Sequence, residues 1–144
     1  MTGSILVQIV WAGAAIAVAI AIQFTGLVLI ARVLRRWQAF GQSARPHWRV
    51  IALGVVTYLL FMLHLIQIVA YALVYYAIGA IPTLRSALYF SAATFTTIGG
   101  TQVRTEEPWQ LFAALQGLSG IVLVGASVSF LVAIVHRMHF WADD

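Results

Sequence analysis

The stretch TFTTIGGTQ, residues 94–102, places threonines and two adjacent glycines between two strongly apolar parts of the chain. Just before the glycines lies SALYFSAATFTT, residues 86–97, which is mostly apolar and contains neither proline nor glycine. About 12 residues form a helix of roughly 18 Å, too short to cross a bilayer. We therefore predict a re-entrant helix followed by irregular backbone at residues 98–102. Such backbone is tolerated at membrane depth only where protein buries it or where it lines a water-filled cavity.

The composition indicates an integral membrane protein. Of the 144 residues, 62% are hydrophobic and only 8% are charged, whereas soluble domains carry about 25% charged residues. The basic residues are eight arginines that lie mostly beside apolar segments, as cytoplasmic membrane flanks do, so we expect no nucleic-acid partner. The chain has no cysteine, which excludes disulfides and thiolate metal sites.

Three apolar runs exceed the roughly 20 residues that a helix needs to span the hydrocarbon core. They are Ile5–Ala31, Trp48–Ile78 and Trp109–Val135. Five arginines lie between or at the edges of the first two runs, and two lie between the second and third. The positive-inside rule then predicts a cytoplasmic first loop and C-terminus, with the N-terminus and residues 79–107 outside. We expect the location to be a bacterial inner (plasma) membrane.

This order of segments resembles the pore module of the tetrameric potassium channels over about residues 50–136. The family's filter motif, T-T-V-G-Y-G-D, follows an aromatic-rich pore helix, and the matching stretch here is ALYFSAATFTTIGGTQ, residues 87–102. The first four motif positions match well, at Thr96, Thr97, Ile98 and Gly99.

The resemblance fails at the last three motif positions. The tyrosine position holds Gly100, the second glycine position holds Thr101, and the aspartate position holds Gln102. Alternatively, the tyrosine is deleted and Gly100 is the second glycine. Both alignments remain open.

The resemblance implies an all-α membrane protein of tetrameric channel architecture, with three transmembrane helices and one re-entrant pore helix per chain. We expect a peripheral N-terminal helix (1–35), a basic cytoplasmic loop (36–47), a pore module (48–136) and a short tail (137–144). Within the pore module, the expected parts are an outer helix (48–78), a pore helix (84–97), a filter (96–102) and an inner helix (108–136).

A cation filter replaces the water around an ion with rings of oxygen atoms, one from each chain. The predicted ligands for K⁺ or Na⁺ are the hydroxyl and carbonyl oxygens of Thr97 and the carbonyl oxygens of Ile98, Gly99 and Gly100. Thr96 and Thr101 complete the predicted filter. Threonine tolerates positive φ poorly. Because Thr101 stands at the second glycine position of the motif, we expect a shorter or wider filter with weaker discrimination between potassium and sodium.

Other residues allow two interpretations each. Gly120 is a candidate gating hinge or a small residue for close helix packing. His64 and Gln67 form either a proton- or ion-sensitive site or a hydrogen-bonded contact with a neighbouring helix. His136 and His139 are candidate pH sensors at the inner mouth or simply a polar membrane flank.

The function that these features favour is a cation channel, potassium-permeable and weakly selective or non-selective, built as a homotetramer among membrane lipids. One alternative is a non-conducting, channel-like membrane protein that serves as an assembly or partner subunit. Another is a membrane subunit of a larger transporter. With four acidic residues and no catalytic motif, we expect no enzyme activity and no cofactor beyond the permeant ions. Gating by a ligand-binding domain would require an accessory regulatory subunit.

Overall fold

The computed structural model describes residues 5–40, 46–99, 103, 105 and 109–139, and those residues form helices joined by short connections. The helices are α1 (Ile5–Phe40), α2 (Pro46–Ala77), α3 (Leu84–Phe95) and α4 (Gln110–His139). Three of them contain segments long and apolar enough to cross a membrane, namely Ile5–Arg36, His47–Ala77 and Gln110–Arg137. The predicted all-α membrane fold, with three spans and one short helix, is confirmed.

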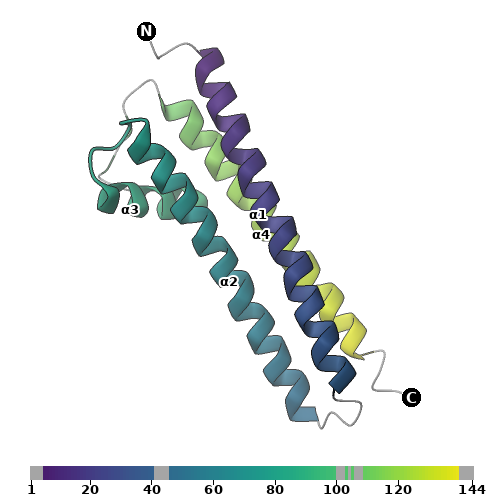
Figure 1. The fold of residues 1–144 in the computed structure, drawn as a ribbon. Coiled ribbons are helices and arrows are strands. Elements are labelled where there is room, and N and C mark those ends of the chain that lie inside the picture. Colours follow the sequence, from purple (N-terminus) through teal and green to yellow (C-terminus); the bar gives the residue numbers. More distant parts are fainter. Residues whose placement is uncertain (1–4, 41–45, 100–102, 104, 106–108, 140–144) are drawn as a thin grey trace.

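The three long helices run alongside one another, and α3 lies against α2 at the end of the bundle where the chain begins (Figure 1). The α3 helix contacts both α2 and α4, while α1 packs against α2 and α4. The C-terminal end of α4 lies at the opposite end of the bundle (Figure 1). The re-entrant helix therefore sits at one end of the molecule, between the second and third spans.

Glycine and proline mark the connection between α2 and α3. Gly79 has a φ of 72°, the left-handed conformation that commonly follows the end of a helix. The backbone N–H of Ala80 returns to the carbonyl oxygen of Tyr75 at 3.0 Å, which satisfies one of the last carbonyls of α2. Pro82 then prevents the helix from continuing. A turn thus separates α2 from α3.

Two apolar clusters hold the helices together. The larger lies around α3 and is rich in aromatic side chains, with Tyr75 and Phe112 almost fully buried. The smaller lies toward the other end, where α1, α2 and α4 meet; its buried members are Leu27, Ile30, Val56, Leu60 and Ile134.

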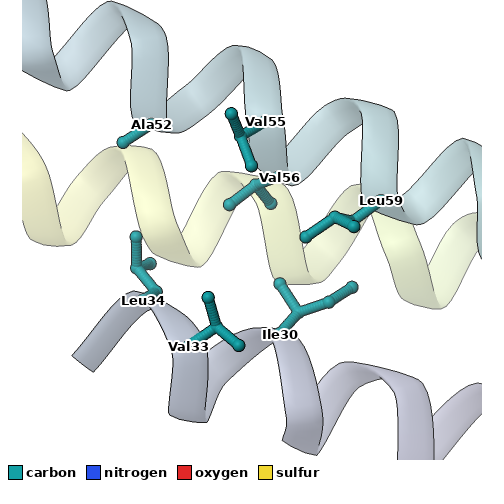
Figure 2. Close-up of a pocket in the computed structure, with 7 residues that line it drawn as sticks. All are labelled: Ile30, Val33, Leu34, Ala52, Val55, Val56 and Leu59. Atoms are coloured by element: carbon teal, nitrogen blue, oxygen red, sulfur yellow. The ribbon is translucent and has the colours of Figure 1, made fainter. Parts of the chain in front are cut away.

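A small hollow lies beside this second cluster, between α1 and α2 (Figure 2). Its lining residues are Ile30, Val33, Leu34, Ala52, Val55, Val56 and Leu59. All of these side chains are aliphatic. The hollow therefore offers no polar group that could bind an ion.

Candidate functional site

Thr83 determines where the re-entrant helix begins. Its backbone is extended, and its hydroxyl oxygen accepts a hydrogen bond from the N–H of Ser86 at 3.2 Å. This is the usual N-cap arrangement. Thr83 is thus the cap, and Ser86 supplies the N–H that it satisfies.

The candidate filter begins directly after the C-terminal end of α3. The helix ends at Phe95, two residues before the predicted boundary, and Thr96 is its C-cap. The Thr96 hydroxyl donates to the carbonyl oxygen of Ala92 at 2.8 Å. The N–H of Thr97 donates to Thr94 O at 3.0 Å, and the N–H of Gly99 donates to Ala93 O at 3.3 Å. These bonds tie the start of the filter segment to the last turn of α3.

Two alternate residues of this segment have left-handed backbone. Thr97 has a φ of 58° and Gly99 a φ of 60°. Glycine adopts this conformation freely, whereas a residue with a Cβ pays roughly 1–2 kcal/mol for it. Thr97 is therefore a strained position, and it is itself a predicted ion ligand. Sequence reasoning missed the positive φ of Thr97, because threonine tolerates this conformation poorly and gives no signal for it.

The candidate ligands lie on the surface of the single chain. Thr96, Thr97, Ile98 and Gly99 are all exposed, and 79% of Ile98 is accessible. Gly100 and Thr101, the other predicted filter residues, lie outside the described residues, as does Gln102. One chain thus presents residues 96–99, the described part of the candidate filter, on an open surface.

A buried glutamine joins α3 to both neighbouring spans. Gln116 of α4 accepts a hydrogen bond from the hydroxyl of Tyr75 in α2 at 2.7 Å. Its amide nitrogen donates to the Ser91 hydroxyl oxygen at 2.9 Å and to the Ser91 carbonyl at 3.2 Å. The Ser91 hydroxyl in turn donates to the carbonyl oxygen of Ile68 at 2.8 Å. Gln116 is 1% exposed and Ser91 is fully buried, so this network fixes the middle of α3 from inside the bundle.

Aromatic rings surround the same network. The ring of Tyr75 meets Phe90 and Phe112 edge to face, with centroid distances of 5.2 and 5.1 Å. Such pairs add about 0.5–1.5 kcal/mol beyond the area they bury. Of the two adjacent aromatic residues in α3, Phe90 is buried in this cluster, whereas Tyr89 is 61% exposed.

Small residues on α4 let the end of α3 approach closely. A Cβ built on Gly120 would overlap the carbonyl oxygen of Phe95, and a Cβ on Gly117 would lie 3.4 Å from the carbonyl oxygen of Thr94. Gly120 therefore has the close-packing role that was one of its two predicted interpretations. Its role as a gating hinge remains a prediction.

The polar pair in the second span contacts a neighbouring helix. Gln67 is fully buried and donates to the side-chain oxygen of Gln23 in α1 at 2.8 Å. His64 lies 3.0 Å from Gln67, measured from Nδ1 to Oε1. The predicted hydrogen-bonded contact is confirmed. Gln23 was not identified from the sequence as its partner.

The remaining candidates lie farther from the filter. His136 is exposed near the end of α4, and the side chain of His139 lies outside the described residues. Ser129 donates to the carbonyl of Gly125 in its own helix at 3.0 Å. Ser127 is buried and accepts a hydrogen bond from Gln23 at 2.8 Å. Within the described residues, no group of three or more metal-ligating side chains comes together.

Comparison with known proteins identifies the family. The family model described as "Ion channel" matches residues 62–137, which is more than half of the chain and includes the second half of α2, all of α3, the candidate filter and most of α4. The chain belongs to this ion-channel family. No curated protein and no solved structure matches the chain.

Membership in the family establishes the class of the protein. It is an integral membrane protein with three candidate spans, and its family is one of ion channels and not of enzymes. The matched segment begins within α2, so α1 lies wholly outside it.

Proposed function

We propose that this chain forms a homotetrameric channel for monovalent cations, permeable to potassium and weakly selective over sodium. The observation that carries the proposal is the segment 96–99. It leaves the end of the re-entrant helix with two left-handed residues and is exposed over its whole length. A filter built from four copies requires this surface to face a shared axis, where the oxygen atoms of Thr97, Ile98 and Gly99 replace the hydration shell of the ion.

The re-entrant helix supports a cation pathway electrostatically. The C-terminus of a helix carries a partial negative charge, equivalent to about half an elementary charge. The α3 helix ends at Phe95, immediately before the filter segment. Four such helix ends around one axis would favour a cation over an anion.

Weak selectivity is proposed because the filter motif is altered after its first glycine. In the ungapped alignment, Gly100 and Thr101 stand where the resembling family has tyrosine and glycine, and in the alternative alignment the tyrosine is deleted. Loss of the tyrosine ring removes a brace that holds the filter at a fixed width. Fewer complete oxygen layers would leave less discrimination between ions that differ mainly in radius.

The deciding experiment is reconstitution of the purified protein in planar bilayers with opposed potassium and sodium gradients. We expect cation current with a reversal potential close to zero. A reversal potential at the potassium equilibrium value would contradict the weak selectivity, although not the channel. Absence of current at all voltages would favour the alternative, a non-conducting partner subunit.

The mass of the detergent-solubilised protein tests the assembly in the same preparation. A homotetramer should give four chain masses. A smaller assembly that conducts only with added subunits would instead indicate a component of a larger transporter.

A further inference from the structure

A buried chain of amide groups links α1, α2 and α4 in the middle of the bundle. Gln67 donates to Gln23 Oε1 at 2.8 Å and to the carbonyl oxygen of Ala19 at 3.4 Å. Gln23 donates to Ser127 Oγ at 2.8 Å and to the carbonyl oxygen of Leu123 at 3.4 Å. Both glutamines are fully buried. Since apolar surroundings offer no competing partner, these bonds determine how the two amides are oriented.

The backbone carbonyls determine which atom donates and which accepts in each hydrogen bond of these side chains. A carbonyl oxygen can only accept, so the groups facing Leu123 O and Ala19 O must be the NH₂ groups of Gln23 and Gln67. The oxygen of Gln67 is then turned toward His64, and it too can only accept. His64 must therefore carry a hydrogen on Nδ1, from which it donates to Gln67 at 3.0 Å. Neutral His64 is accordingly the Nδ1–H tautomer, with Nε2 unprotonated.

His64 touches the end of the re-entrant helix. Its ring lies against the ring of Phe95, with the centroids 5.6 Å apart and the planes tilted by 48°. Phe95 is 2% exposed and is the last residue of α3. The backbone carbonyl oxygen of Phe95 lies against Gly120 of α4. The residue that leads into the filter is therefore held between His64 and the third span.

We propose that Gln23 and Gln67 are positioning residues through which α1 controls the filter end of α3. Gln23 orients Gln67, Gln67 holds His64 as the Nδ1–H tautomer, and the His64 ring supports Phe95. Gln23 lies outside the matched family segment, which begins at residue 62. The first span is thus a functional part of the pore, and not only a peripheral helix. The effect on permeation rests on the proposed channel function, whereas the state of His64 does not.

Nitrogen NMR of ¹⁵N-histidine-labelled protein in bilayers tests the first part without any current. The His64 signal is identified by its loss in His64→Phe. In the wild type, this signal should be that of the Nδ1–H tautomer. Gln67→Leu and Gln23→Leu should each shift it to the Nε2–H tautomer or to a mixture of the two.

Gln8→Leu is the matched control. Gln8 is a second buried glutamine of α1, and its Oε1 has no hydrogen-bond partner among the described residues. This variant should leave the His64 signal unchanged. A His64 signal that is unaffected by Gln23→Leu would overturn the proposal.

Two further readouts separate positioning from simple stabilisation. Gln23→Leu with Gln67→Leu removes both buried amides together, so neither amide is left without the other, and this double variant should be less destabilised than the sum of the two single variants. This double variant should still lose the NMR contact between His64 and Phe95. If the wild type conducts, the double variant should also give a reversal potential that differs from that of the wild type under the same ion gradients. Wild-type selectivity in a conducting double variant would overturn the positioning role, whereas a silent wild type would refute only the channel function.

Discussion

Residues 97 and 99 carry the unusual backbone of the candidate filter. Both have positive φ, but the cost falls only on Thr97, since Gly99 has no Cβ. The candidate filter is thus strained at Thr97, the residue whose hydroxyl is a proposed ion ligand. Strained backbone persists only where its surroundings impose it. At Thr97, the imposed geometry includes the hydrogen bond from its N–H to Thr94 O.

Gly99→Ala tests whether the left-handed backbone is needed for permeation. A Cβ at residue 99 would meet nothing within 4 Å in the single chain, so the cost is mainly conformational, roughly 1–2 kcal/mol per chain. We expect a folded protein that loses most of its current in bilayer recordings. Gly54→Ala is the matched control, because a Cβ there also meets nothing within 4 Å and the residue lies within α2. Equal currents from both variants would contradict the filter assignment.

At the scale of the elements, the position of α3 depends on polar contacts in an apolar setting. Gln116 joins α4 to both α2 and α3, and its partners Tyr75 and Ser91 are fully buried. A buried polar group that loses its partner costs about 1–3 kcal/mol. The network therefore specifies where the short helix sits, in a region where apolar contacts alone would allow it to slide.

Gln116→Leu should lower thermal stability in detergent, because the Tyr75 hydroxyl would lose its acceptor, at a cost of about 1–3 kcal/mol. The double variant Gln116→Leu with Tyr75→Phe removes both polar partners, so it should recover much of the lost stability. Thermal unfolding followed by circular dichroism gives both values. A single variant as stable as the wild type would mean that the network does not hold α3.

The elements differ in how far the sequence could predict them. The spans and the short helix followed from composition, from segment length, and from the absence of proline and glycine in residues 86–97. The partner of Gln67 could not be predicted, because Gln23 lies 44 residues away in an otherwise apolar run and periodicity does not show which helices become neighbours. The backbone of Thr97 was missed because the neighbouring hydrogen bonds override the intrinsic preference of threonine.

At the scale of the whole molecule, the two ends of the bundle differ in charge. Arg32, Arg35 and Arg36 lie in the last turns of the span formed by α1, and Arg49 lies in the first turn of α2. The opposite end holds α3, with Arg85 near its start. The positive-inside rule places the arginine-rich end in the cytoplasm, so that the filter faces outward. This orientation is a prediction from charge alone.

Because the chain contains no cysteine, single introduced cysteines can report the orientation directly. Ser43→Cys marks the basic loop, and Pro82→Cys marks the exposed turn before α3. With an impermeant maleimide added to intact cells, we expect labelling at residue 82 and protection at residue 43. Permeabilised cells should label both, which controls for thiol reactivity. The reverse labelling pattern would place the filter at the cytoplasmic face. The negative ends of the α3 dipoles would then favour a cation site that is reached from the cytoplasm.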